Sequence, residues 1–161
     1  MYFSHFDSPV GPLLLAADES GLRQLAFPCE KTKKTPPSDW QENGAFFGET
    51  SRQLTAYFAG QLRTFDLPLA PQGTPFQLQV WQTLPEIPYG QTLSYGALAQ
   101  KIGNPKASRA VGAANGQNPL PILIPCHRVI GANGRLTGFA GGLETKKALL
   151  SLEQRHSFTL S

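Results

Sequence analysis

Residues 94–115 read SYGALAQKIGNPKASRAVGAAN and contain two short helical patterns separated by a break. Ser94 is placed to cap a first helix, whose apolar positions share one face: Tyr95, Leu98, Ala99 and Ile102. Gly103 ends this helix, and Asn104-Pro105 supplies both a break and a fresh start, so a second helix is predicted from Pro105 to about Asn115. Two short helices joined in this way resemble a helix-turn-helix.

The second helix of this pair is unusually thin. Arg109 stands among small residues, namely Ala107, Ala110, Gly112, Ala113 and Ala114. A thin helix can approach a nucleic-acid backbone closely, but small residues also allow a helix to pack tightly inside a protein core. The absence of carboxylates around the helix favours the first interpretation.

The charge of the chain is divided along its length. Residues 1–86 hold nine acidic and six basic residues, a net charge of −3, whereas residues 87–161 hold two acidic and eight basic residues, a net charge of +6. No carboxylate occurs between Ile87 and Leu143. Such a segment attracts a polyanion, although a mildly basic surface with no partner would give the same charges.

The residues before the helix pair indicate a small α+β unit. Short β-like runs at 2–6, 12–17 and 22–27 are separated by turn-like sequences, which predicts an antiparallel meander. A helix is predicted from about Gly48 to Gly60, and residues 65–69 are compatible with a returning strand. A linker follows at 70–73, so we expect one domain over residues 1–72 and a second over residues 73–161.

The second domain opens with a well-marked helix. Thr74-Pro75-Phe76-Gln77 combines an N-cap Thr, a Pro at the first helical position and a Gln placed for a capping box. Further along, residues 119–125 contain three prolines among apolar residues, which predicts a rigid, buried, extended segment. A last helix is predicted from Glu144 to about His156. Its inward face is formed by Ala148, Leu149 and Leu152.

Length and composition exclude several classes of protein. The chain has 161 residues, 40% apolar and 16% charged, which is typical of a globular protein with one domain or two small ones. It has neither a run long enough to span a membrane nor a signal-peptide pattern, so we expect a cytoplasmic protein with no membrane partner. Cys29 and Cys126 are too few for a disulfide scaffold, and no Cys/His group has zinc-site spacing.

Cys126 is a candidate nucleophile. It stands at the end of the stiff apolar segment and is followed by His127 and Arg128, and basic neighbours favour the reactive thiolate. A free, buried, inert cysteine is the alternative. Adjacent side chains of an extended segment point in opposite directions, so a water or a bend has to connect His127 to the thiol. Glu153 is placed to lie on the inward side of the last helix, where His127 would be a suitable partner.

These residues carry a resemblance to a known family. Pro125-Cys126-His127-Arg128-Val129, with residues 118–124 before it and Gly141-Gly142-Leu143 after it, resembles the active-site signature of the methylated-DNA–protein-cysteine S-methyltransferases, or O6-alkylguanine-DNA alkyltransferases. Arg109-Ala110-Val111-Gly112 adds to the match, which covers about residues 74–155. The resemblance implies an α+β protein with a small ribonuclease H-like first domain and a mainly helical, winged-helix-like second domain that contains the helix-turn-helix.

The resemblance also implies a mechanism. Cys126 would accept an alkyl group from O6 of guanine in an irreversible, stoichiometric transfer, and O4-methylthymine is a further possible substrate. His127 would act as its base through a bound water, and Glu153 would orient His127. Tyr95 would give a hydroxyl proton to the guanine ring and crowd the adjacent phosphate. Asn118 would be a hinge that ties the helix-turn-helix to the active-site segment.

The implied partner is double-stranded DNA that contains O6-alkylguanine. Arg109 would enter the duplex in place of the extruded nucleotide, because O6 in a stacked base lies out of a buried thiol's reach. The remaining residues expected at the DNA are Ala110, Ala113, Ala114, Tyr95 and Arg128. Backbone groups of Cys126, Val129 and the loop around Ala140 would read the extruded base, and the pocket for this base would include Val129, Phe139 and Ala140.

Two positions depart from the family pattern. Phe139 stands where many members have Tyr, and Ala140 where some have Ser, so we expect an altered substrate tolerance. The zinc site found in some members has no counterpart here, because Cys29 and His5 lack enough companions. We therefore expect no metal, no cofactor and a monomer.

Two other functions remain open from the sequence. The first is a helix-turn-helix DNA-binding module with a structural cysteine and no chemistry. The second is a thiol hydrolase that turns over many times, although no oxyanion hole can be identified for it. The mass of Cys126 after exposure to damaged DNA distinguishes both from an alkyl acceptor.

Overall fold

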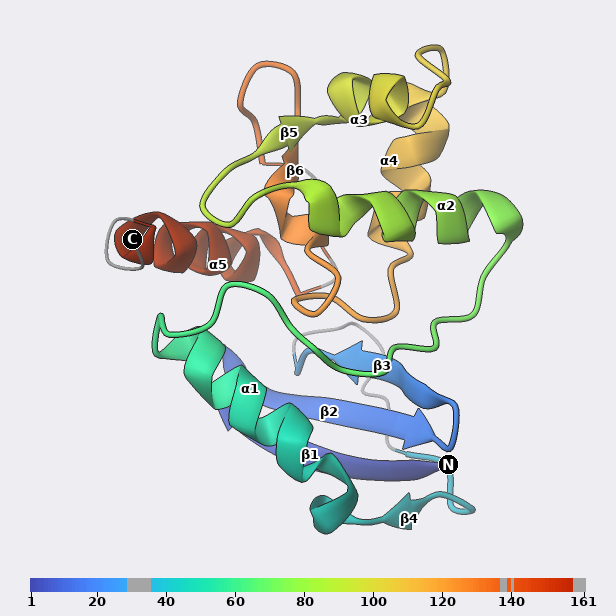
Figure 1. The fold of residues 1–161 in the computed structure, drawn as a ribbon, viewed down its shortest axis with the longest axis vertical. Helices are drawn as coiled ribbons and strands as arrows, with labels where there is room; N and C mark the ends of the chain where they lie inside the picture. Colours follow the sequence, from blue (N-terminus) through green and yellow to red (C-terminus); the bar gives the residue numbers. More distant parts are fainter. Residues whose placement is uncertain (29–35, 137–138, 140, 158–161) are drawn as a thin grey trace.

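A four-stranded sheet forms the first half of the molecule (Figure 1). The computed structural model describes residues 1–28, 36–136, 139 and 141–157. The strands are β1 (Tyr2–Ser8), β2 (Gly11–Asp18), β3 (Gly21–Ala26) and β4 (Gln41–Glu42), in the order β3-β2-β1-β4. The first three are antiparallel neighbours, with Tyr2 opposite Ala17 at one end of the β1–β2 pair and Ser8 opposite Gly11 at the turn. The predicted meander is therefore confirmed, and the short parallel strand β4 extends it.

Helix α1 (Gly48–Phe58) lies across one face of this sheet, after a 3₁₀ turn at Gly44–Phe47 (Figure 1). Its buried side chains include Leu54 and Tyr57, which belong to the same apolar core as Leu13 and Leu15 of β2. The helix agrees with the predicted range except for its last two residues. The α1–sheet pair forms the first layer of the core.

Residues 65–69 do not form the returning strand that the sequence allowed. Only Leu69 makes a bridge, to Leu22 of β3. Around it, Leu22 N–H donates to the Pro68 carbonyl at 2.8 Å, and Ala70 N–H donates to the Leu22 carbonyl at 2.8 Å. Pro68 has no N–H to donate to a ladder, so pairing does not propagate along the segment.

The second half begins with helix α2 (Pro75–Thr83), which is followed by a 3₁₀ turn at Leu84–Glu86. Both hydrogen bonds of the predicted capping box are present: the Thr74 hydroxyl accepts from Gln77 N–H, and the Gln77 side chain accepts from Thr74 N–H. Trp81 of this helix is buried, and its indole N–H donates to the Ala114 carbonyl at 2.8 Å. Helix α2 thus anchors the end of the helix pair to the core.

The helix pair consists of α3 (Tyr95–Lys101) and α4 (Ser108–Gly116). Ser94 caps α3 as predicted, because its hydroxyl accepts from Ala97 N–H. Helix α4 starts three residues later than predicted: Ala107 N–H bonds back to the Asn104 carbonyl at 3.0 Å, so residues 104–107 form a turn of their own. The two helices pack against each other, which confirms the helix-turn-helix. Together with the four-stranded sheet of the first half, these helices confirm the α+β class.

The proline-rich segment before Cys126 is buried but not extended. Ile124 N–H bonds to the Leu120 carbonyl at 2.8 Å, and Ile122 has a φ of +73°, in the left-handed region. The segment therefore turns on itself beneath the helix pair. It leads into a 3₁₀ turn at Cys126–Arg128 and then strand β6 (Val129–Ile130), which pairs in parallel with β5 (Leu93–Ser94).

Helix α5 (Leu143–His156) closes the fold and lies near the C-terminal end of α1, where Tyr57 contacts Glu153 (Figure 1). Leu149 and Leu152 face inward as predicted, but Ala148 is exposed, and Lys146 occupies an inward position instead. Among the residues that the structure describes, no helix has the length and apolar character needed to cross a membrane.

Candidate active site

Cys126 begins the 3₁₀ turn that follows the buried segment, and only 4% of its surface is exposed. Its backbone is held on both sides: its N–H donates to the Ile124 carbonyl at 2.7 Å, and its carbonyl accepts from Asn115 Nδ2 at 3.3 Å. The backbone therefore bends at Cys126–Arg128 and is not extended there. Cys29 lies outside the described residues.

The environment of the Cys126 thiol favours its protonated form. Burial raises its pKa to about 11, against a hydrogen bond from Asn118 and the charge of Lys146, which both lower it. Basic neighbours alone therefore do not produce a thiolate at neutral pH, contrary to what the sequence suggested. A nucleophilic Cys126 needs a base to remove its proton.

His127 has the properties of such a base. It is completely buried, and its Nε2 lies 2.6 Å from Glu153 Oε2. Burial holds the pKa of His127 below its usual value, although the Glu153 carboxylate opposes this shift. The neutral ring therefore donates its Nε2–H to Glu153, which leaves the lone pair on Nδ1. Among the described residues, Nδ1 has no hydrogen-bond partner.

Glu153 accepts hydrogen bonds from several directions although none of its surface is exposed. His127 and Tyr57 donate to Oε2, at 2.6 and 2.7 Å, and Gly90 N–H approaches Oε1 at 3.3 Å. Arg128 spans both oxygens, with Nε at 2.8 Å from Oε1 and Nη2 at 3.0 Å from Oε2. Burial raises the pKa of this carboxyl, but the bonds from His127 and Arg128 outweigh burial and hold it well below its usual range.

The prediction that Arg128 contacts DNA is wrong, because the residue is buried. The residue is 5% exposed, and its third guanidinium nitrogen, Nη1, donates to the Ile87 carbonyl at 2.8 Å. The guanidinium also lies over the ring of Tyr89, with 5.7 Å between Arg128 Cζ and the ring centroid. A guanidinium matches a carboxylate in a bidentate pair, and Glu153 needs a buried counter-charge. Arg128 therefore neutralises Glu153 and is out of reach of a phosphate.

Lys146 is a functional candidate that the sequence interpretation missed. It is completely buried on α5, seven residues before Glu153, and its Nζ donates to the Val129 carbonyl at 2.7 Å. Burial lowers the pKa of Lys146, and Cys126 opposes this shift. The helical period could have identified it, because Lys146 lies on the same face of the helix as Leu149 and Glu153, which were expected to face inward.

Helix α4 exposes part of the surface that was expected to face DNA. Arg109, Ala110 and Ala113 are exposed. Ala114 is 3% exposed and faces α2, so its predicted contact with DNA is wrong: α4 has to pack against the core through one side. The half-buried Tyr95 begins α3, and a Cβ on Gly112 would lie 3.5 Å from its ring. This distance is an ordinary van der Waals contact, so the ring of Tyr95 lies directly against α4 at Gly112.

Asn118 has the contacts that the hinge interpretation requires. Its Nδ2 donates to the Ile124 carbonyl at 2.9 Å, and its Oδ1 accepts from Leu120 N–H at 3.0 Å. With the bond to the Cys126 thiol, these contacts join the end of the helix pair to the segment that carries the cysteine.

The three residues expected around the extruded base are only partly described. Val129 is completely buried, and its N–H bonds to the Cys126 carbonyl, while its own carbonyl accepts from Lys146. Phe139 packs against Phe27 of the first half, with 5.4 Å between ring centroids. Ala140 lies outside the described residues.

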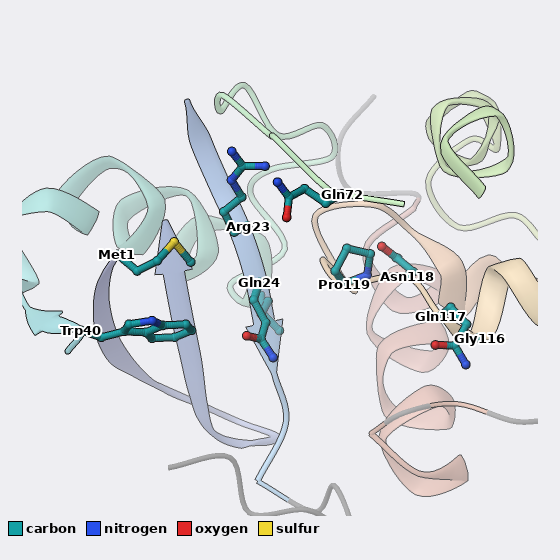
Figure 2. A pocket seen from close by; sticks show the side chains of 10 residues that line it. Met1, Arg23, Gln24, Trp40, Gln72, Gly116, Gln117, Asn118 and Pro119 are labelled. Atoms are coloured by element: carbon teal, nitrogen blue, oxygen red, sulfur yellow. The ribbon is translucent and has the colours of Figure 1, made fainter. Parts of the chain in front are cut away.

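A separate cleft of about 490 Å³ opens between the sheet and the end of α4 (Figure 2). Figure 2 shows Arg23 and Gln24 of β3 on one side, and Gln117, Asn118 and Pro119 on the other. Cys126 and His127 are not among the described residues that line it. In the described part of the chain, no group of three or more His, Cys, Asp or Glu side chains is arranged to hold a metal ion; the absence of a metal stays a prediction.

Comparisons with known proteins identify the family to which the chain belongs. Models of the 6-O-methylguanine DNA methyltransferase family match residues 1–71 (the ribonuclease-like domain) and 75–155 (the DNA binding domain). A methylated-DNA–protein-cysteine methyltransferase of Methanosarcina acetivorans is 60% identical over 153 residues, which are 95% of this chain and 98% of that protein. One from Mycolicibacterium paratuberculosis is 51% identical over 151 residues, or 94% of this chain and 91% of that protein.

Among solved structures, Mycobacterium tuberculosis OGT in complex with DNA superposes with a TM-score of 0.89 at 50% sequence identity, over 97% of this chain and 94% of that chain. The chain therefore belongs to the 6-O-methylguanine DNA methyltransferase family. Membership makes it a methyltransferase with a ribonuclease-like first domain and a DNA-binding second domain.

Proposed function

We propose that this protein repairs double-stranded DNA by moving the alkyl group of O6-alkylguanine irreversibly onto Cys126. The buried Cys126–His127–Glu153 arrangement supports this proposal most strongly, because it pairs a protonated thiol with a neutral imidazole that a carboxylate holds in one tautomer. All of these groups belong to one chain, so we propose that a single copy is sufficient for the transfer and that the protein acts as a monomer.

The reaction begins with a proton transfer. A water between the thiol and His127 Nδ1 carries the proton of Cys126 to the imidazole, and Glu153 stabilises the imidazolium that forms. The sulfur then attacks the alkyl carbon in line with the C–O bond. The C–O electron pair passes into the guanine ring, which takes a proton from the Tyr95 hydroxyl, and the phenolate regains a proton from the imidazolium through solvent. The products are a thioether on Cys126 and an unmodified guanine.

The thioether has no good leaving group, so each molecule reacts once. O4-methylthymine presents the same kind of methyl–oxygen bond, and we propose it as a second substrate. Phe139, whose ring packs against Phe27, is expected to line the pocket for the base and to change which alkyl groups are accepted. The rate of transfer of an alkyl group bulkier than methyl tests this expectation.

Access to the buried thiol requires base extrusion. The exposed face of α4 with Ala110 and Ala113 comes close to the DNA backbone, and Arg109 fills the space that the extruded nucleotide leaves. Tyr95, at the start of α3, crowds the neighbouring phosphate. Asn118 holds the cysteine segment in fixed relation to these helices.

The test is the intact mass of the protein after incubation with duplex DNA that carries O6-methylguanine. We expect a permanent gain of one methyl group per molecule, located on Cys126 by peptide mapping. Cys29→Ser is the matched control and keeps the gain, whereas Cys126→Ala loses it. Repaired DNA with an unchanged protein mass would contradict the proposal, and DNA binding without repair would indicate a binding module that has no chemistry.

A further inference from the structure

The first domain contributes a side chain directly to the buried network of the second. Tyr57 lies in the last turn of α1, and its hydroxyl donates to Glu153 Oε2 at 2.7 Å. Both side chains are completely buried, and the two residues are 96 positions apart in the sequence. None of the chemical steps above assigns a part to Tyr57 or to any other residue before Gly73.

The oxygen that Tyr57 binds is the one that faces the imidazole. Oε2 accepts from Tyr57 at 2.7 Å, from His127 Nε2 at 2.6 Å and from Arg128 Nη2 at 3.0 Å. Three donors at one carboxylate oxygen divide its negative charge among them. The hydrogen bond from Tyr57 therefore weakens the attraction of Glu153 Oε2 for the imidazole proton of His127.

Tyr57 is held in place on several sides. Its ring contacts Phe58, Phe65 and Tyr89, with ring centroids 5.3, 5.4 and 6.3 Å away. Burial and the nearby Glu153 carboxylate raise the pKa of Tyr57, so its hydroxyl keeps its proton and remains a donor at neutral pH. The hydroxyl therefore has a fixed position and a fixed role as a hydrogen-bond donor.

We propose that Tyr57 is a positioning residue for the alkyl transfer, supplied by the first domain: it fixes the Glu153 carboxylate and limits the negative charge that this carboxylate presents to His127. The inference rests on the proposed function. With the hydroxyl in place, His127 stays neutral and able to accept a proton. Without it, Glu153 Oε2 attracts the imidazole proton more strongly, and His127 becomes protonated at a higher pH.

The test compares Tyr57→Phe with Tyr89→Phe in the full-length protein. Both substitutions remove one buried hydroxyl and keep the ring, but the Tyr89 hydroxyl has no hydrogen-bond partner among the described residues. Single-turnover methylation of Cys126 is measured across pH, together with DNA affinity. In Tyr57→Phe, we expect the acid limb of the pH–rate profile to shift upward by about one pH unit. Below the midpoint of this limb, the methylation rate then falls by about tenfold. We expect Tyr89→Phe to stay within about twofold of the wild type.

A second measurement does not depend on activity. The ring of His127 is titrated by NMR in the wild type and in both variants, and its signals are assigned with His127→Gln. An upward shift of the pKa in Tyr57→Phe alone supports the inference. A Tyr57→Phe variant that matches Tyr89→Phe in rate and titration overturns it, as does a loss of rate with no change in the titration. A wild type that never methylates Cys126 refutes the proposed function instead, while the titration still reports on Tyr57.

Discussion

Arg109 and Arg128 belong to the same carboxylate-free stretch of sequence, yet the fold gives them opposite environments. Arg109 stands on the exposed face of α4 among small residues, whereas Arg128 is buried against Glu153 and the ring of Tyr89. Lys146 joins Arg128 in the interior. Part of the positive charge that suggests DNA is therefore used to neutralise groups around the active site.

Net charge along a sequence is therefore not a map of surface potential. A buried cation acts on its immediate partners at low dielectric, and its loss leaves a charge unpaired. An exposed cation acts on a partner in solution, and its loss leaves the fold intact. The following substitutions separate the two kinds of cation.

The largest effect is expected for Arg128→Met, which leaves the buried Glu153 carboxylate without its bidentate partner. We expect the free energy of unfolding in urea to fall by about 3–5 kcal/mol. The double variant Arg128→Met/Glu153→Leu regains much of this loss, because both buried charges are gone. Equal stability of the wild type and Arg128→Met would mean that Arg128 is exposed in solution, as Arg109 is.

Acid should weaken the same network by a smaller amount. The pKa of Glu153 is held below its unfolded value, so its contribution is complete above that value, about 4.3, and is lost as the pH falls further. The lowered pKa of His127 acts in the same direction below about pH 6.5. We expect urea midpoints to fall from pH 7 to pH 3, and the part of this fall below about pH 4.3 to be smaller in the Arg128→Met/Glu153→Leu variant, which lacks the Glu153 carboxyl. A flat profile for the wild type would contradict both shifts.

Lys146→Met tests the other buried cation. Removing its charge raises the pKa of Cys126 further, so alkylation of the thiol by iodoacetamide between pH 7 and 9 is expected to slow by about tenfold. The exposed neighbour Lys147 provides the matched control, since Lys147→Met leaves the rate unchanged. Equal rates in the two variants would show that Lys146 does not act on the thiol.

Arg109→Ala is expected to change the unfolding free energy by no more than about 0.5 kcal/mol. Repair of a lesion in duplex DNA should weaken, while transfer from the free base O6-methylguanine changes less, because only the duplex substrate needs its extruded nucleotide replaced. Lys106→Ala, which removes another exposed cation beside α4, is the control, and we expect it to weaken duplex repair less than Arg109→Ala does. Equal losses on both substrates would argue against a role of Arg109 in extrusion.

Much of the site could be predicted because its signals are local. The capping residues Thr74 and Ser94 locate two helices, and the helical period places Glu153 on the inward face of α5, where it meets His127. The contacts of Asn118 agree with the hinge interpretation on the same local basis.

The parts that could not be predicted depend on distant contacts or on burial of charge. A cation in sequence is ordinarily read as solvated, so Arg128 and Lys146 were not assigned to the interior. The turn at Ile122 needs a left-handed conformation that an isoleucine rarely adopts, and surrounding packing imposes it. Tyr57 gave no local sign, because its partner lies 96 residues away.

The bond between Tyr57 and Glu153 has a consequence for the order in which the molecule is built. It closes a very long loop, and two neighbouring contacts close others: Arg63 Nη2 donates to the Ser157 carbonyl at 2.7 Å, and a Cβ on Gly60 would collide with the ring of His156. The first domain can form its sheet during synthesis, but the Glu153 carboxylate gains its phenolic partner only after the last helix has emerged and docked. Completion of this buried network is therefore a late event in folding.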